Sequence, residues 1–269
     1  MRTILASTHH DPEGRLLAQA ARVLPALASL FDGMAVFVTA QTARATEATL
    51  AHGGARCVWA DPGLPVGHGH LGLWRRAALG AALHAWPVGE LYLFCDLDRA
   101  LHWAEFHGDE LRERLELARI YDCTVFGRTP RAFASHPRAQ RDTEAIANHA
   151  FALVSGLPWD VMTACRGLSR RAAELIVGGC DDDTVGSDCS WPLLCRRAGL
   201  RLGYDETEGM EFETLDRYGD ELAALGGAQA WLDRFDADPR QWLDRLELAR
   251  AEAASAVRYG LEGGAPVEA

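Results

Sequence analysis

Short hydrophobic runs alternate with stretches of helical periodicity through the first half of the chain. Apolar runs of about four to eight residues, bounded by polar or glycine-rich segments, are typical of buried strands. On this basis we predict strands over residues 3–6, 34–39, 56–60, 91–95 and 123–126.

Amphipathic stretches between these runs predict helices. Asp11, Pro12 and Glu13 place a cap residue, a first-turn proline and an acid at a helix start, and apolar residues follow at helical spacing over 16–27. Regular alternation of strand and helix implies right-handed crossovers between parallel strands. We therefore predict an α/β fold, with a mostly parallel, Rossmann-related central sheet and helices on both faces. In such sheets ligands bind beyond the carboxyl ends of the strands.

The second half of the chain has a different pattern, with helical stretches and acidic loops and fewer strand-like runs. Helical spacing over 142–153, 169–177 and 188–197 predicts helices, and so does the spacing of aromatic and leucine residues between 231 and 248. We predict a main domain over residues 1–218, a C-terminal helical extension over 219–257 and a flexible tail over 258–269.

Composition narrows the possible partners. The chain has 269 residues with 48% hydrophobic and 24% charged content, which is ordinary for a globular protein. A formal charge of -11 repels phosphate backbones, so we expect neither nucleic acid nor an anionic membrane surface as a partner. All basic residues are arginine, and the lack of lysine excludes mechanisms that need a lysine Schiff base or a P-loop lysine.

The apolar segments and the cysteines indicate the cellular compartment of the protein. The apolar run at the N-terminus is too short for a signal-peptide core, and no run approaches the length of a membrane span. The seven cysteines include no Cys-x-x-Cys pair and lie mostly in apolar contexts, as expected of buried free thiols. We predict a cytoplasmic protein that acts on small molecules, with homo-oligomers possible.

Asp96 and Asp98 follow the fourth predicted strand directly. If the strand continues through them, its alternation points both carboxylates the same way, and two hard oxygen ligands suit Mg²⁺ or Mn²⁺ shared with phosphate oxygens. Two other interpretations stay open. The pair could simply cap a polar strand end, or Arg99 could neutralise one aspartate so that no metal binds. A bound diphosphate would reconcile Arg99 with a nearby metal.

Two further segments could contribute to a site. The glycine-rich loop 67–72 precedes Arg75 and Arg76, whose guanidinium groups can bind phosphate, although one of two adjacent helical arginines commonly points to solvent. Asp188 lies at the start of a predicted helix. It is either a helix N-cap or a general base held near an acceptor hydroxyl.

The order and placement of these features, over about residues 1–215, resemble the GT-A class of nucleotide-sugar-dependent glycosyltransferases. The features in chain order are Thr8 after the first strand, Arg75 and Arg76 after the glycine-rich loop, Asp96 and Asp98 in a D-x-D motif, and Asp188 at a helix start. The resemblance implies a nucleotide-diphosphate sugar as donor, UDP- or GDP-linked, with Mn²⁺ or Mg²⁺ as cofactor.

Roles for single residues also follow from the resemblance. It implies that Asp98 ligates the metal directly, that Asp96 supports the ribose or a bound water and shares in the metal site, and that Asp188 is the catalytic base if transfer inverts. Together with Thr8 and the three arginines at 75, 76 and 99, Asp96 would bind the donor. Many members supply a late histidine as third metal ligand, but this chain has none after His149.

Glu208 or Glu211 would have to replace that histidine, and we assign Glu211. The prediction is thus a metal-assisted glycosyltransferase with an unknown acceptor, inverting or retaining. The alternatives are a sugar-phosphate nucleotidyltransferase, or a degenerate protein that binds a nucleotide sugar without turnover. The usual glycine-rich nucleotide loop and first-turn lysine of the nucleotidyltransferases are missing here.

Overall fold

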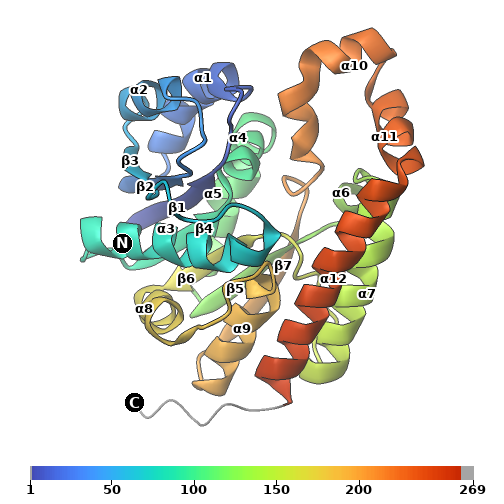
Figure 1. Ribbon diagram of the computed structural model, residues 1–269. Helices are drawn as coiled ribbons and strands as arrows, with labels where there is room; N and C mark the ends of the chain where they lie inside the picture. The colour runs from blue at the N-terminus through green and yellow to red at the C-terminus, as the bar shows by residue number, and fades with distance from the viewer. Residues whose placement is uncertain (1, 262–269) are drawn as a thin grey trace.

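A computed structural model describes residues 2–261, and within them the chain forms a seven-stranded mixed sheet flanked by helices (Figure 1). The strand order is β3-β2-β1-β4-β6-β5-β7. The strands are β1 (Thr3–His9), β2 (Gly33–Val38), β3 (Arg56–Trp59), β4 (Leu91–Cys95), β5 (Cys123–Arg128), β6 (Cys165–Ser169) and β7 (Leu202–Thr207). β6 runs antiparallel to both β4 and β5, and the other pairs are parallel. The predicted mostly parallel α/β sheet is confirmed.

Two layers of helices cover the sheet, and the alternation of side chains along each strand supplies a core to each layer. Leu5 packs with the layer of α1 (Leu17–Ala28), α2 (Ala45–His52), α4 (Leu97–Phe106) and α5 (Gly108–Ala118). Its neighbours Ile4 and Ala6 pack on the other face, with α3 (Leu71–Ala85), α7 (Arg138–Ser155), α8 (Arg170–Gly179), α9 (Ser187–Arg197) and α12 (Pro239–Gly260).

The five predicted strands correspond to β1 through β5, each within three residues at either end. The first helix differs more, because α1 begins at Leu17 and not at Asp11. The Asp11 carboxylate instead accepts hydrogen bonds from the backbone N–H groups of Arg15 and Leu16, at 3.0 and 2.8 Å, and so caps the turn before the helix. All seven cysteines are free thiols, and six of them are buried.

The C-terminal helices form two distinct parts. α10 (Gly219–Leu225) and α11 (Ala228–Ala237) stand away from the sheet, whereas α12 runs beside α7 and against α9 (Figure 1). The Ser255 hydroxyl of α12 donates to Oδ2 of Asp182 at 2.6 Å, which ties the helix to the loop before α9. α12 continues to Gly260, and residues 262–269 of the predicted tail lie outside the described part. No helix within residues 2–261 has the length and apolar character that crossing a bilayer requires.

The remaining short elements lie next to the carboxyl ends of the strands. They are η1 (His68–His70), α6 (Pro130–Ala134) and η2 (Glu213–Tyr218). η1 leads directly into α3, α6 follows β5, and η2 lies between β7 and α10. Ligands bind at these positions in open α/β sheets, so a site is expected next to these elements.

Candidate functional site

The carboxyl ends of β1 and β4 meet in the middle of the sheet, because the two strands are parallel neighbours with Ala6 beside Phe94. Thr8 follows Ala6 by two residues, and Asp96 follows Phe94 by two residues. The Thr8 hydroxyl donates a hydrogen bond to Oδ1 of Asp96. Burial raises the pKa of Asp96, and the guanidinium of Arg75 acts against that rise. The structure therefore brings together two residues that the sequence assigned to one donor site.

Asp98 lies in the first turn of α4 and not on an extended strand. β4 ends at Cys95, and after Asp96 the chain enters the helix directly, so strand alternation does not set the direction of the second carboxylate. Oδ1 of Asp98 accepts a hydrogen bond from the backbone N–H of Arg99 at 2.9 Å, and Oδ2 pairs with Arg217 at 2.7 Å. Burial acts to raise the pKa of Asp98, but Arg217 outweighs it and the pKa is lowered.

Arg75 of α3 joins Asp96 to the start of α9. The residue is 4% exposed, and Nη2 lies 3.3 Å from Oδ2 of Asp96. Nη1 lies 3.2 Å from Oδ2 of Asp188 and donates to the Ser187 hydroxyl at 2.8 Å. Burial opposes the charged guanidinium, but Asp188 and Asp96 raise the pKa of Arg75. A cation fixed between two carboxylates offsets their mutual repulsion in a buried site.

Asp188 does not serve as the N-cap of α9, whose cap residue is Gly186. Its carboxylate contacts Arg75 through one oxygen and Arg166 through the other, at 3.2 and 3.4 Å. Both distances exceed the roughly 2.7–2.9 Å of strong charge-assisted hydrogen bonds, so neither arginine holds the carboxylate in a short ion pair. Asp188 also lines a cavity together with Arg75 and Asp96. This placement fits the predicted base better than the capping alternative.

The other two predicted donor-binding arginines have different partners. Arg76 contacts the backbone oxygen of Asp182 and the carboxylate of Asp183, so it holds the acidic loop to α3 and does not reach Asp96. The Arg99 guanidinium pairs with Glu213 at 3.0 Å. Its ion pair is therefore with neither aspartate of the D-x-D motif, although its charge acts on both and Arg99 lines the cavity beside Asp96.

Glu211 lies in a different cluster from the two aspartates. Its Oε1 lies 2.9 Å from Nε2 of His107 and 3.3 Å from Nε2 of His102, and its Oε2 pairs with Arg131 at 2.6 Å. Burial opposes the charged form, but the hydrogen bonds from His107 and Arg131 lower the pKa of Glu211 to about 2. Within residues 2–261 no set of three or more His, Cys, Asp or Glu side chains is placed to hold a metal. The predicted ligand set with Glu211 is therefore not assembled in this structure.

Asp96 and Asp98 still provide the oxygen donors that a hard cation prefers. Mg²⁺ on a nucleotide usually takes only one or two carboxylates, while phosphate oxygens and water complete its shell. Each oxygen of the two carboxylates already has a partner, so a cation at Asp98 would have to displace Arg217. The residues fit a metal that arrives with a diphosphate, because the released guanidinium could then contact the phosphate.

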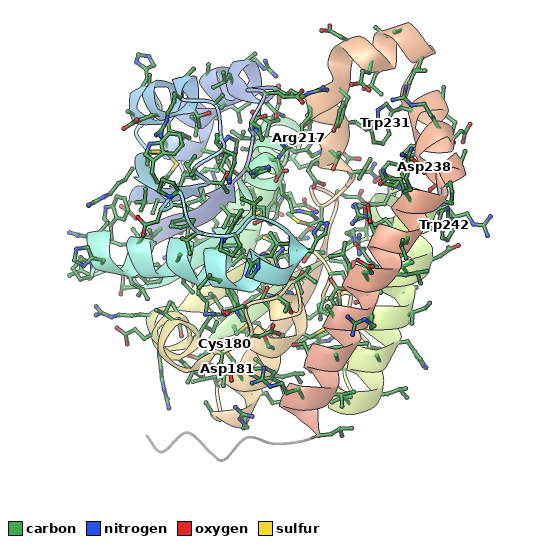
Figure 2. The ribbon with its side chains drawn as sticks, in the orientation of Figure 1. Cys180, Asp181, Arg217, Trp231, Asp238 and Trp242 are labelled. Atoms are coloured by element: carbon green, nitrogen blue, oxygen red, sulfur yellow. The ribbon has the colours of Figure 1, made fainter. Side chains whose placement is uncertain are left out.

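Arg166, Arg217 and Glu252 belong to this region, and sequence reasoning did not anticipate them. Arg166 of β6 donates to the backbone oxygen of Asp188 at 3.0 Å, in addition to its contact with the carboxylate. Arg217 lies where the chain leads into α10 (Figure 2) and also donates to the backbone oxygen of His10. Glu252 reaches the cavity from α12. A signal for Glu252 existed, since it is an acid on the buried face of an alanine-rich helix.

His9, at the end of β1, makes the stability of the protein sensitive to acid. It is 4% exposed, and burial lowers its pKa to about 4. Between pH 6.5 and 4 the unfolded chain therefore binds a proton that the folded chain does not, so stability is complete above pH 6.5 and is lost as the pH falls. We expect the free energy of unfolding to fall by about 1.4 kcal/mol per pH unit, or about 3 kcal/mol in total, from His9 alone.

Urea denaturation at half-unit pH steps measures this slope. His9→Gln removes the titrating group and should flatten the curve between pH 6.5 and 4, and His84→Gln, the same substitution at an exposed site, is the control. Equal slopes in the wild type and the His9 variant would show that His9 is protonated in the folded state.

Comparison with solved structures finds glucosyl-3-phosphoglycerate synthase from Mycobacterium tuberculosis, in complex with phosphoglyceric acid. The likeness covers 96% of this chain and 80% of that one, with 16% sequence identity and a TM-score of 0.53. The chain has the GT-A fold. At this level of identity the likeness establishes the fold alone.

Two further structures are similar to a lesser degree. One is the same mycobacterial enzyme with Mn²⁺, UDP and glucosyl-3-phosphoglycerate, at 17% identity and a TM-score of 0.49, with 91% of this chain and 80% of that chain covered. The other is described as a mycobacterial protein, at 16% identity and a TM-score of 0.48. That likeness covers 76% of this chain and 65% of the length of the mycobacterial protein. No protein-family model and no curated protein sequence matches the chain.

Proposed function

We propose that the protein transfers a sugar from a nucleoside-diphosphate donor to an acceptor hydroxyl. The observation that carries the proposal is the continuous set of contacts from Thr8 through Asp96 and Arg75 to Asp188. These residues come from four separate elements of a GT-A fold and converge at the carboxyl ends of β1 and β4. A donor bound at Asp96 would thus lie next to a carboxylate that can accept a proton.

Each residue has a defined task in this proposal. Thr8 and Asp96 contact the nucleoside end of the donor, and Arg75 lies between that end and Asp188. Asp98, with Asp96, would hold Mn²⁺ or Mg²⁺, and such a cation stabilises the diphosphate as it leaves. Arg217, once released from Asp98, offsets the remaining negative charge of the diphosphate. Glu211 has no task here, since its carboxylate bonds His107 and Arg131.

The transfer itself joins the acceptor oxygen to the anomeric carbon of the sugar and breaks the bond from that carbon to the diphosphate oxygen. Asp188 receives the hydroxyl proton. A single displacement of this kind inverts the configuration at the anomeric carbon, so NMR analysis of the product distinguishes it from a retaining reaction.

A uridine donor is the first choice, because the solved neighbour with the same fold carries UDP and Mn²⁺ in one of its structures. We expect UDP-glucose with Mn²⁺ to raise the melting temperature by roughly 5 °C at 100 times its dissociation constant. Asp98→Asn should abolish the shift, because an amide replaces a charged metal ligand. Differential scanning fluorimetry with and without Mn²⁺ measures both effects, and GDP-linked sugars serve as comparison.

Asp109→Asn is the matched control, since Asp109 is an exposed aspartate on α5 that pairs only with Arg112. It should retain the full shift. If UDP-glucose binds equally well without a divalent cation, Asp98 holds Arg217 permanently and the metal assignment fails. If no nucleotide sugar binds under either condition, the proposed function fails as a whole.

Binding without turnover is a second possibility, favoured by one observation. Both carboxylates of the D-x-D motif are paired with arginines, Asp96 with Arg75 and Asp98 with Arg217. A protein that keeps these pairs could bind a nucleotide sugar without catalysing its cleavage. Slow hydrolysis of UDP-glucose by the wild type, measured as UDP release, favours the transferase, and its absence with a broad set of acceptors favours the binding protein.

A further inference from the structure

A cavity of about 140 Å³ adjoins the proposed donor site. It lies between the start of α3, the buried side of α7, the start of α9 and the middle of α12. Asp96, Arg75 and Asp188 form one part of its wall, and Met162, Leu248 and Ala249 are among the apolar residues of the rest. Any molecule in this space would therefore meet the carboxylate of Asp188 directly.

Four polar side chains of the wall have an atom without a partner among the described residues: Nε of Arg75, Nε of Arg99, Oε1 of Gln140 and Oε2 of Glu252. Glu252 is 4% exposed, yet its Oε2 forms no hydrogen bond within the described residues. Oε1 of Gln140 on α7 is likewise buried and unpaired, while its Nε2 donates to Glu144 at 2.8 Å. A buried polar atom without a partner costs roughly 1–3 kcal/mol, so four in one cavity indicate a ligand that supplies the missing hydrogen bonds.

The charges around the cavity disfavour an anion. Each arginine of the wall is already paired with a carboxylate: Arg75 with Asp96 and Asp188, Arg99 with Glu213, and Arg245 with Glu144 at 4.0 Å. Burial, followed by the charges of Asp188 and Glu144, raises the pKa of Glu252, which favours the protonated carboxyl, a group with both a donor and an acceptor. A hydroxyl complements such a group and can also accept from the unpaired Nε of Arg75 or Arg99. A carboxylate or phosphate would instead add negative charge to a wall whose arginines are already paired with carboxylates.

The size of the cavity limits the ligand further. A cavity of about 150 Å³ in another protein holds benzene, which has six non-hydrogen atoms. Glycerol also has six, so it matches a space of this size. We propose that this cavity is the acceptor subsite of the transferase proposed above, and that it takes a neutral three-carbon polyol, either glycerol or the glyceryl end of a larger acceptor, through hydrogen bonds to Glu252 and Gln140.

In this subsite one hydroxyl of the polyol faces Asp188. Its oxygen bonds to the anomeric carbon of the sugar, the bond from that carbon to the diphosphate oxygen breaks, and the hydroxyl proton passes to Asp188 while UDP leaves. The other hydroxyls stay bound to Glu252 and Gln140. Glu252 is therefore an acceptor-binding residue and takes no proton in the reaction.

The test measures UDP release from UDP-glucose by the full chain with glycerol, D-glycerate or 3-phosphoglycerate as acceptor. We expect glycerol to accelerate UDP release above the rate of donor hydrolysis, and the two anions of the same carbon length to have no effect. Acceleration by 3-phosphoglycerate but not by glycerol would overturn the assignment. If glycerol has no effect although UDP-glucose still binds, the assignment also fails.

Variants of Glu252 give a second, independent readout. Glu252→Met keeps the length of the side chain but removes its hydrogen bonds, and we expect the KM for glycerol to rise about tenfold or more. The melting temperature of this variant should rise, because a buried unpaired carboxyl is replaced by an apolar group. Glu252→Gln retains a donor and an acceptor, so its KM for glycerol should stay within about threefold of the wild type.

The two proposals fail in different ways. Loss of the thermal shift with UDP-glucose in the wild type ends the proposed function, and the acceptor assignment ends with it. An intact donor shift in Glu252→Met together with an unchanged KM for glycerol rejects the acceptor subsite alone. A lower melting temperature for Glu252→Met would show that Glu252 stabilises the fold and would reject its role as a ligand-binding residue.

Discussion

Replacing Asp188 with asparagine is expected to lower kcat for sugar transfer by about 10²–10⁴-fold, which is the range that general acid–base catalysis contributes. Asparagine fills the same space and its amide oxygen can still accept from Arg75 or Arg166. It cannot take the acceptor proton. Because Arg75 keeps its contact with Asp96 at 3.3 Å, the thermal shift with UDP-glucose should change little. Initial rates of UDP release and donor titrations by fluorimetry separate the two effects.

Asp182→Asn is the matched control for this variant. Asp182 is also a buried aspartate near the start of α9, but its oxygens accept from Thr184 and Ser255 and it does not line the cavity. The control should lose stability and keep its kcat. If Asp188→Asn keeps kcat within tenfold of the wild type, Asp188 only positions Arg75 and no base acts from α9. A product with retained configuration would agree with that outcome.

The parts of the fold that sequence predicted well are those with both faces buried. Every residue of β1 and β4 is buried, and a strand covered on two faces is a continuous apolar run, which is a strong signal. Parallel pairing of these two strands then places Thr8 next to Asp96. The prediction of a ligand site at this edge of the sheet rested on that geometry, and the contact between the two residues agrees with it.

β6 was not predicted as a strand, and its composition explains why. Its five residues, Cys165–Ser169, include Arg166 and Gly167, which are unusual in the centre of a sheet. Arg166 is buried because its guanidinium donates to several backbone oxygens, those of Val161, Cys165 and Asp188. These acceptors are assembled only in the folded chain, so local sequence gives no hint that the arginine is buried.

The environment of Asp98 could not be predicted from the sequence either. The apolar positions Leu97, Ala100 and Leu101 have helical spacing, but the D-x-D motif directed the interpretation toward an extended segment. Its partner Arg217 lies 119 positions away, on a segment whose path over the sheet depends on how η2 and α10 pack. Pairings of this kind depend on tertiary structure, and the same holds for Glu211 with His107 and Arg131.

The division into a main domain and a C-terminal extension separates Glu252 from the site in sequence, but the fold brings them together. α12 packs along α7 and α9, and its buried face continues the wall that contains Asp188. Helical periodicity predicted that the helix exists, but Leu243 and Leu246, on which the prediction partly rested, are exposed. It could not predict that the surface it covers contains a cavity, because that depends on the shapes of three separate elements.

Replacing Arg128 with methionine is expected to cost the protein about 3–5 kcal/mol of unfolding free energy, as breaking a buried ion pair typically does. The Arg128 side chain is 0% exposed and contacts Asp160 through Nε at 2.7 Å and Glu144 through Nη2 at 2.6 Å. Without the guanidinium, two carboxylates are left in the interior without a cation between them. Asn148 still donates to Asp160, and Gln140 still donates to Glu144. Urea denaturation at pH 7 measures the loss.

The pH dependence of this loss distinguishes an ion network from simple packing. Burial opposes ionisation of Asp160, but Arg128 lowers its pKa, so Asp160 stabilises the folded state above its unfolded pKa and this contribution is lost as the pH falls. In Arg128→Met the pKa of Asp160 should rise, because the guanidinium, the largest effect that opposes burial, is gone. The difference between variant and wild type should therefore be largest near pH 7 and shrink toward pH 4, whereas a cavity left by lost packing would cost the same at both.

Arg112→Met serves as the surface control, since Arg112 and Asp109 form an exposed pair one helical turn apart. Its loss should be about 0.5 kcal/mol or less at either pH. A loss near that value for Arg128→Met would mean that water or other donors replace the guanidinium and that the interior beside β5 is less enclosed than the structure shows. Glu144 also lines the cavity assigned to the acceptor. The same variant, Arg128→Met, should therefore weaken glycerol turnover more than donor binding. Such a result would link the stability of this network to the site beside it.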